Sequence, residues 1–213
     1  MLKTKNSSSK VAEFLLKIKA IKLQPEDPFK WASGWNSPIY CDNRKTLSHP
    51  EIRTYIKDCF CKEISSNYGT PDLIAGVATG GIALGALIAE QMNLPFCYVR
   101  SQAKAHGLNN TIEGEIQKGQ NVVVIEDLIS SGKSSLNAVR DLRDAGLNVI
   151  GMGAIFSYGF QIADDNFKAA DCKLFTLTNY TKLLTEAVNT NYISDQMISS
   201  LEKWRNSPST WKK

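Results

Sequence analysis

The sequence predicts an α/β fold, with a central parallel sheet flanked by helices. Short apolar runs alternate with helical patterns from residue 73 onwards, and this order of elements builds parallel sheets covered by helices. The chain has 213 residues, 43% hydrophobic and 22% charged, which fits one compact domain of ordinary size. We expect residues 1–48 to form a helix and a hairpin, here called the hood, over a core of residues 49–213.

Composition argues against several classes of protein. The net charge of +4 arises from 25 basic and 21 acidic residues, an excess too mild to indicate nucleic-acid binding by itself. The five cysteines form no CxxC pair and no Cys/His cluster, which predicts reduced thiols in a cytoplasmic protein. The first ten residues are polar, unlike a signal peptide, and no apolar run approaches the ~18 residues of a membrane helix. We therefore expect a cytoplasmic protein that binds neither nucleic acid nor membrane.

The hood and the segment after it predict a helix, a hairpin and the start of a second helix. Apolar residues recur at offsets of three and four over residues 11–21, as in an amphipathic helix. Residues 29–43 combine aromatic and turn residues and predict a hairpin. Ser48 precedes Pro50 and Glu51 in a capping-box pattern, so we expect the second helix to begin at Ser48.

Strands and helices then alternate to the end of the chain. Short runs of apolar residues are typical of strands buried on both faces of a sheet. We expect strands at residues 73–77, 96–99, 122–125, 149–156 and 174–177. We expect helices at residues 85–92 and 134–145, and a terminal helix that frays within residues 193–213.

The strongest sign of a binding site is the run VVVIEDLISSGKSS at residues 122–135. Glu126 and Asp127 follow four β-branched residues, at the end of a strand where ligands bind in open α/β sheets. The small-residue loop at 130–135 then enters a helix, and its backbone N–H groups and the helix dipole suit a phosphate monoester. Carboxylates and a phosphate loop together suit a sugar phosphate. The spacing is not that of a Walker A loop, and a strand that simply ends beside a helix cap is the alternative.

Two other segments carry candidate anion-binding groups. Residues 100–107 place Arg100, Lys104 and His106 in a polar insert, and a mobile cationic loop can close on a pyrophosphate and exclude water. A solvated basic surface loop is the alternative reading of this segment. A glycine-containing turn after the strand at 73–77 can bring backbone amides close to an anion, although tight packing of a helix on a strand explains its glycines equally well. The residues of this turn are Ala78, Thr79, Gly80 and Gly81.

The run at residues 122–135 resembles the motif with which type I phosphoribosyltransferases bind phosphoribosyl pyrophosphate (PRPP). The resemblance implies the type I phosphoribosyltransferase fold, in which the acidic pair holds the ribose hydroxyls and the loop cradles the 5′-phosphate. It also implies that the cations of residues 100–107 contact the pyrophosphate of PRPP. The PRPP-binding residues expected from it are Arg100, Lys104, His106, Glu126, Asp127, Leu128, Ile129, Ser130, Ser131, Gly132, Lys133 and Ser134.

Two segments are similar to orotate phosphoribosyltransferases in particular. Residues 29–44 resemble their base-binding hairpin, and residues 100–107 resemble their mobile loop. The resemblance implies transfer of the 5-phosphoribosyl group from PRPP to orotate, which gives orotidine 5′-phosphate and pyrophosphate in pyrimidine biosynthesis. It implies Mg²⁺ held mainly by PRPP and water, with no dedicated protein ligands. It also implies a homodimer whose loop residues are shared across the interface.

The same resemblance assigns roles to individual residues. The turn at 78–81 becomes the pyrophosphate loop. The expected catalytic residues are Lys104, His106 and Asp127. The residues expected at orotate are Ser33, Gly34, Tyr40 and Ser130.

Three positions depart from the family pattern. Ser101 stands where the mobile loop usually has a lysine, and Ala32 stands where many members have one. Tyr158 stands where many members carry an arginine that faces orotate. At Ser101 one contact to the pyrophosphate of PRPP is lost or is supplied by another group. The three departures leave the PRPP assignment intact and bear mainly on orotate as the base. They leave a phosphoribosyltransferase for another base, or a PRPP-sensing regulator that binds nucleic acid, as alternatives; a binding domain without catalysis fits the cationic loop poorly.

Overall fold

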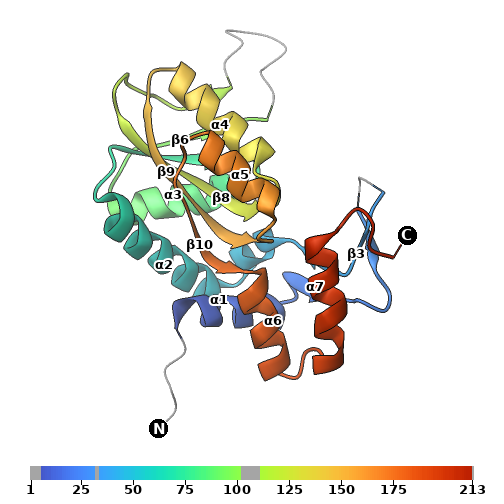
Figure 1. The fold of residues 1–213 in the computed structure, drawn as a ribbon. Coiled ribbons are helices and arrows are strands. Elements are labelled where there is room, and N and C mark those ends of the chain that lie inside the picture. Colours follow the sequence, from blue (N-terminus) through green and yellow to red (C-terminus); the bar gives the residue numbers. More distant parts are fainter. Residues whose placement is uncertain (1–5, 32–33, 102–110, 213) are drawn as a thin grey trace.

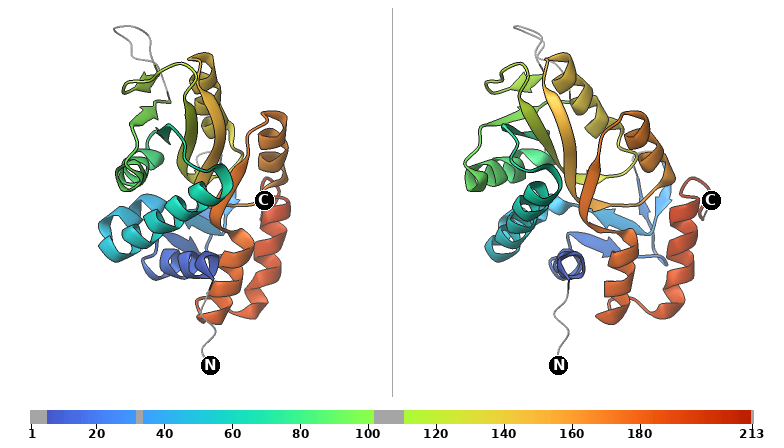
Figure 2. Two further views of the ribbon diagram at one scale, coloured as in Figure 1. Left: turned by 90° about the vertical axis from the view of Figure 1, so that its left-hand side faces the viewer. Right: turned by 60° about the vertical axis from the view of Figure 1, so that its left-hand side comes forward.

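The computed structural model describes residues 6–31, 34–101 and 111–212 of the chain. A twisted six-stranded sheet with helices on both faces forms its larger part, and segments from the two ends of the chain pack together beside it (Figures 1 and 2). From one edge to the other the strands are β10 (Leu174–Asn179), β9 (Asn148–Ser157), β8 (Asn121–Ile129), β5 (Leu73–Val77), β6 (Phe96–Val99) and β7 (Ile112–Glu113). All neighbouring pairs are parallel except β6 and β7, which confirms the predicted fold class.

Successive residues of the central strands face two different cores. Val123 and Ile125 of β8 pack with the face that carries α2 (Pro50–Tyr68) and α3 (Gly80–Met92). Val122 and Val124 pack with the opposite face, which carries α4 (Lys133–Asp144) and α5 (Gln161–Ala169). Because side chains alternate along a strand, a continuous apolar run is what a sheet covered on both faces requires.

The hood differs in detail from its prediction. Its elements are α1 (Ser7–Lys17), β1 (Ile21–Leu23), β2 (Phe29–Lys30), β3 (Asn36–Ser37), β4 (Ile39–Cys41) and the 3₁₀ helix η1 (Asn43–Ser48). The first helix ends at Lys17 rather than at residue 21, because Lys19 adopts a left-handed conformation and Ile21 pairs with Cys41 in an antiparallel ladder. The predicted hairpin is present as β2 and β3, whereas β4 pairs with β1.

The predicted capping box at the start of α2 is wrong. Ser48 is the last residue of η1, and His49 is the residue that precedes the helix. No side chain caps this helix, and Pro50 occupies its first turn. Proline has no backbone N–H, so the first turn of α2 has one fewer N–H group that needs a hydrogen-bond partner.

The C-terminal segment is packed and does not fray. It contains α6 (Tyr180–Asn189), the short 3₁₀ helix η2 (Asp195–Met197) and α7 (Ile198–Asn206). The predicted terminal helix is present, but Leu201 and Trp204 of α7 are fully buried, so the expectation that it frays is wrong. The sequence patterns also gave no prediction of α5 and α6. Within the described ranges, no helix is both long enough and apolar enough to cross a membrane.

Candidate active site

The acidic pair lies inside β8 and not beyond its end. The strand runs to Ile129, four residues further than predicted, because it continues to pair with β9 as far as Ser157. Its pairing with β5 stops earlier, at Ile125 opposite Gly76. Glu126 and Asp127 therefore occupy a stretch of β8 that has one strand neighbour only, with the turn after β5 beside it.

Glu126 is buried and hydrogen-bonded. Only 6% of its surface is exposed, and its carboxyl oxygens accept hydrogen bonds from the Ser135 hydroxyl and the Asp127 N–H, each at 3.0 Å. Burial is the main cause that raises the pKa of Glu126 to about 8, and the negative charge of Asp127 adds to the shift. Burial beside Asp127 therefore favours the protonated form of Glu126 in the unliganded protein.

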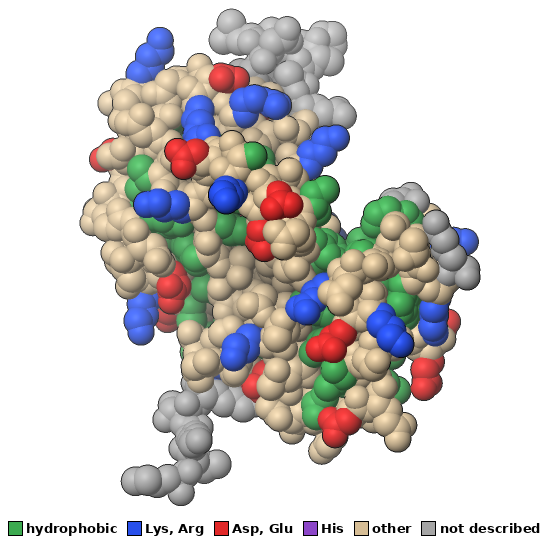
Figure 3. All heavy atoms as spheres, in the orientation of Figure 1, with side chains coloured by type: hydrophobic (Ala, Val, Ile, Leu, Met, Phe, Trp, Pro, Cys, Tyr) green, Lys and Arg blue, Asp and Glu red, His purple; other side chains and the backbone are tan. Residues whose placement is uncertain are grey.

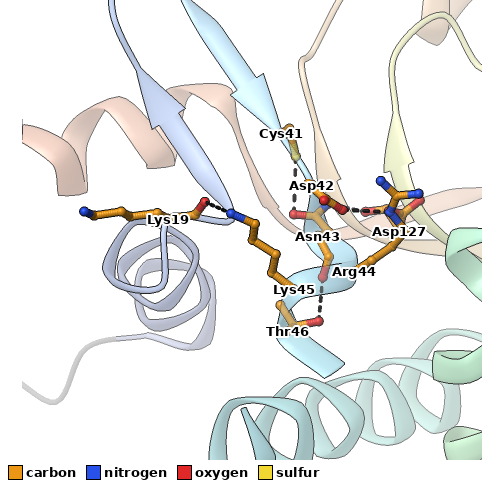
Figure 4. A network of polar contacts seen from close by, with 8 residues as sticks. All are labelled: Lys19, Cys41, Asp42, Asn43, Arg44, Lys45, Thr46 and Asp127. Carbon is orange, nitrogen blue, oxygen red and sulfur yellow. Dashed lines mark hydrogen bonds and ion pairs between the residues drawn. The ribbon is translucent and has the colours of Figure 1, made fainter. Parts of the chain in front are cut away.

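Asp127 lies between the turn after β5 and η1 of the hood. A Cβ atom added to Gly80 would fall 2.3 Å from its carboxylate, so the two loops touch. The Asp127 carbonyl accepts a 2.7 Å hydrogen bond from the side-chain amide of Asn43, which is almost fully buried (Figure 4). Burial raises the pKa of Asp127, while the hydrogen bond with Glu126 and the charge of Arg44 oppose the shift.

Sequence reasoning missed Asn43 and Arg44. Arg44 forms a 2.7 Å ion pair with Asp42 and lies on the Asp127 side of η1 (Figure 4). The only sequence signal was three consecutive polar residues after the hairpin, and a separation of 84 residues between Asn43 and Asp127 gives no hint that they meet.

The loop after β8 forms a cavity of about 310 Å³. Its lining joins three predicted segments: the turn at 78–80, the residues from Glu126 to Leu128, and the loop at 130–135. Gly132 has a φ of 77° and packs against Phe167, which leaves no room for a side chain. The Asn166 side chain of α5 donates a 2.9 Å hydrogen bond to the Ser131 carbonyl and so holds the loop.

Two residues of the predicted lining face away from this cavity. Ile129 is fully buried in the core beneath α4 and α5. Gly81 is buried as well, because α3 begins at Gly80 instead of at residue 85 and a Cβ at Gly81 would lie 2.2 Å from the Ile125 carbonyl oxygen. Gly81 thus follows the packing alternative, whereas Ala78, Thr79 and Gly80 line the cavity, where binding of an anion stays a prediction.

A second cavity, of about 640 Å³, adjoins the first. Ser130 and Ser131 line both. Its walls include Trp31 and Trp35 of the hood and Phe160 from the start of α5. Figure 3 shows the hollow between α5 and α7, with hydrophobic side chains along its edge. The pair of cavities offers a polar compartment joined to one with aromatic walls.

The remaining predicted residues either do not line these two cavities or fall outside the described residues. Arg100 follows β6 and bonds Glu113 at 3.4 Å, and it does not line the 310 Å³ cavity. Neither Gly34 nor Tyr40 lines the 640 Å³ cavity; Tyr40 is 41% exposed and its ring lies 5.6 Å from that of Phe29. Three predicted residues fall outside the described ranges: Ser33, Lys104 and His106.

Of the three departures from the family pattern, Tyr158 is the one that the structure explains. Its side chain is 3% exposed and packs against Trp31, Phe160 and Trp204, with ring centroids 5.3 to 5.8 Å away. Tyr158 is therefore a core residue that supports Trp31 and Phe160, two residues of the 640 Å³ cavity, without lining that cavity itself. Ser101 is exposed and Ala32 lies outside the described residues.

Comparisons with known proteins agree on one family. The phosphoribosyl transferase domain model matches residues 45–183. The chain is 56% identical to an orotate phosphoribosyltransferase of Cytophaga hutchinsonii, over 98% of this chain and 100% of the relative. It is 49% identical to that of Listeria innocua, over 95% and 97%. The crystal structure of the enzyme from Aeropyrum pernix matches with a TM-score of 0.75 at 25% identity, over 86% of this chain and 99% of that one.

These matches confirm the resemblance drawn from the sequence motifs. They extend over nearly the whole chain, hood and C-terminal helix included, where the motifs alone covered about residues 29 to 160. The chain belongs to the phosphoribosyl transferase family and, within it, to the orotate phosphoribosyltransferases.

Proposed function

We propose that the chain transfers the 5-phosphoribosyl group of PRPP to orotate, giving orotidine 5′-phosphate and pyrophosphate, as the name of its relatives states. The observation that carries the proposal is the joined pair of cavities. The acidic pair, the phosphate loop and the turn after β5 line one of them, and the other has aromatic walls. A sugar phosphate fits the first and a flat pyrimidine fits the second.

The reaction breaks the C–O bond between C1′ of the ribose and pyrophosphate and forms a C–N bond to the base, whose ring N–H proton is released to water or to the departing pyrophosphate. Negative charge accumulates on the departing pyrophosphate while the ribose gains oxocarbenium character. Catalysis then rests on positioning and on fixed charges near the leaving group. In this proposal Asp127 orients the ribose hydroxyls, Lys104 neutralises the pyrophosphate, and His106 donates a hydrogen bond or a proton to it.

Mg²⁺ fits the residues of this site as a partner of PRPP. The described part of the chain holds no cluster of three or more metal-ligating side chains. Mg²⁺ binds through one or two carboxylates together with substrate phosphates and water, and Asp127 lines the cavity with a carboxylate available for that role. The ion would supply charge neutralisation at the pyrophosphate.

The direct test is an absorbance assay with PRPP, Mg²⁺ and orotate, with adenine, hypoxanthine and uracil as parallel bases. We expect orotate to be consumed only when PRPP is present, and we expect removal of Mg²⁺ by a chelator to stop the reaction. Consumption of another base in place of orotate would contradict the assignment of the aromatic cavity. Inactivity with every base would favour a PRPP sensor instead.

Replacement of Lys104 by Ala is expected to lower kcat by about 10²- to 10³-fold, because one preorganised charge at the leaving group is lost. Lys182→Ala, an exposed lysine of α6, is the matched control and should retain wild-type kcat. Steady-state kinetics with saturating PRPP and orotate measure both. A Lys104→Ala rate within about threefold of wild type would show that this role is wrong.

We propose further that the enzyme is a homodimer whose loop at residues 100–107 completes the partner's site. Each site then takes Asp127 from one protomer and Lys104 from the other, so Lys104→Ala and Asp127→Asn impair contributions from different protomers. Mixed refolding of the two inactive variants should restore about a quarter of the wild-type rate, since half of the dimers are hybrids with one intact site of two. Mixtures that stay inactive would contradict the sharing of residues between protomers.

The cysteines support a reducing compartment, the cytoplasm. None of Cys41, Cys59, Cys61, Cys97 and Cys172 is in a disulfide, and Cys97 and Cys172 are buried. Burial raises the pKa of the Cys97 thiol to about 11, which keeps it protonated and unreactive. Reduced thiols of this kind persist where cellular reductants maintain them.

A further inference from the structure

Two fully buried residues, Leu201 and Trp204, hold α7 in place, and Trp204 makes its ring contacts. Trp204 has no exposed surface, and its ring meets those of Trp31, Tyr158, Phe160 and Tyr180 at centroid distances of 5.5 to 5.8 Å. These rings come from the hood, from the end of β9 and from the starts of α5 and α6. The backbone beside Trp204 is consequently fixed by packing in the core, although it lies close to the C-terminus.

Arg205 is that neighbour, and it lies where the aromatic cavity meets two smaller ones. It lines the 640 Å³ cavity together with Trp31, Trp35 and Ser130. Its guanidinium donates a 2.7 Å hydrogen bond to the Thr181 hydroxyl and lies 5.8 Å from the centre of the Tyr180 ring. A guanidinium has five donors in a rigid fork, and Thr181 takes one of them.

The lining of this cavity has a distinct chemical character. Among its described residues, aromatic, small and uncharged polar side chains predominate, and Arg205 is the one with a formal charge. Two tryptophans favour a flat ring, and one guanidinium favours a carboxylate bound through two parallel hydrogen bonds. Ser130 and Ser131 connect this compartment to the one that holds the acidic pair.

We propose that Arg205 is a specificity-determining residue that binds the carboxylate of the pyrimidine base. The inference rests on the proposed function, because orotate is a flat ring with one carboxylate. A substrate seated across Ser130 and Ser131 would place its ribose beside Glu126 and Asp127 and its base between the tryptophans. Arg205 then distinguishes orotate from uracil, which has the same ring without the carboxylate.

The test compares two nucleotides that differ by this carboxylate alone. Dissociation constants of orotidine 5′-phosphate and uridine 5′-phosphate are measured by calorimetry for wild type and Arg205→Gln. A charge-assisted hydrogen bond contributes enough for its loss to weaken orotidine 5′-phosphate by about 10- to 100-fold. Binding of uridine 5′-phosphate should change by less than about twofold, because that ligand never makes the contact.

Three further measurements separate recognition from structure. Lys203→Gln removes the same charge from an exposed neighbour on α7 and should leave both constants unchanged. Thr181→Val removes the hydroxyl that Arg205 contacts but keeps the guanidinium, so it should retain most of the preference for orotidine 5′-phosphate. In steady-state kinetics, Arg205→Gln should raise KM for orotate and leave KM for PRPP near its wild-type value.

Equal weakening of both nucleotides by Arg205→Gln, or no weakening of either, would overturn the inference. A rise in KM for PRPP alone would overturn it as well, since the guanidinium would then serve the phosphates. These results leave the proposed function standing as long as the wild type consumes orotate. A wild-type enzyme that ignores orotate would remove the proposed function and, with it, the basis of the inference.

Discussion

At the scale of single residues, the active site contains a carboxyl group, that of Glu126, whose surroundings disfavour its ionised form. Glu126 is buried beside Asp127 and is bonded to Ser135 and to the next backbone N–H. The free energy of unfolding therefore depends on the protonation of Glu126. Sites that bind a ligand often hold groups in such unfavourable states, because the ligand later interacts with them.

Replacement of Glu126 by Gln is expected to stabilise the unliganded protein increasingly as pH rises. The native carboxyl keeps its proton up to about pH 8, whereas the unfolded one releases it near 4.5, so the wild type loses stability as pH rises through this window. Gln does not titrate, and its amide can accept from the Asp127 N–H and donate to Ser135.

Urea unfolding at several pH values between 5 and 8 checks this prediction, with exposed Glu202→Gln as control. The gain from Glu126→Gln should be small near the lower pH and reach a few kcal/mol near the upper one. The same variant should bind PRPP more weakly. A stability difference that does not grow with pH would contradict the buried, protonated state.

At the scale of elements, two adjacent glycines begin α3, and each leaves room for a different neighbour. Gly81 lets the helix approach β8, since a Cβ there would lie 2.2 Å from a backbone carbonyl oxygen. Gly80 leaves space for the Asp127 carboxylate. One glycine therefore serves packing and the other serves the site, although they are adjacent in the sequence.

The variants Gly81→Ala and Gly80→Ala should separate these duties. Gly81→Ala should lower the free energy of unfolding by about 1–3 kcal/mol, because the backbone of β8 cannot move aside. Gly80→Ala should mainly raise KM for PRPP, because the Asp127 side chain can rotate away. Ala83→Ser, exposed on the same helix, is the control for both. Equal losses of stability from the two glycine variants would argue against this division.

At the scale of the whole molecule, the two ends of the chain are joined around the aromatic cluster. Trp204 links α7 to Trp31 of the hood, and the Asn36 side chain donates a 2.6 Å hydrogen bond to the Lys212 carbonyl. The Lys212 amine in turn contacts the Pro25 carbonyl at 2.6 Å. The hood is thus held from both sides, by the sheet and by the C-terminal segment.

Replacement of Trp204 by Ala should lower the free energy of unfolding by about 3–5 kcal/mol, because it leaves a large cavity where five rings meet. Trp35→Ala is the matched control: Trp35 is 41% exposed, and its loss should lower stability by about 1 kcal/mol or less. Equilibrium unfolding in urea measures both. Similar losses for the two tryptophans would show that α7 does not anchor the hood.

The sequence by itself determined the parallel α/β sheet, the family, and the acidic pair with the small-residue loop that follows it. These features are local, since a β-branched run, two carboxylates and a small-residue loop follow one another within residues 122–135. Local patterns fix which backbone conformation a segment prefers and which groups it presents. The predictions of a capping box at Ser48 and of a fraying tail were wrong for the same reason. Each rested on the local sequence alone, whereas the structure there depends on packing against other segments.

Only the tertiary structure decided which distant residues complete the site. Asn43 reaches Asp127 across 84 residues, and Arg205 shares a cavity with Ser130 because Trp204 seats α7 in the core. The full length of β8 and the early start of α3 depend likewise on what packs beside them. Contacts of this kind are set by the path of the chain and by the fit of side chains, and neither is visible in the pattern of a single segment.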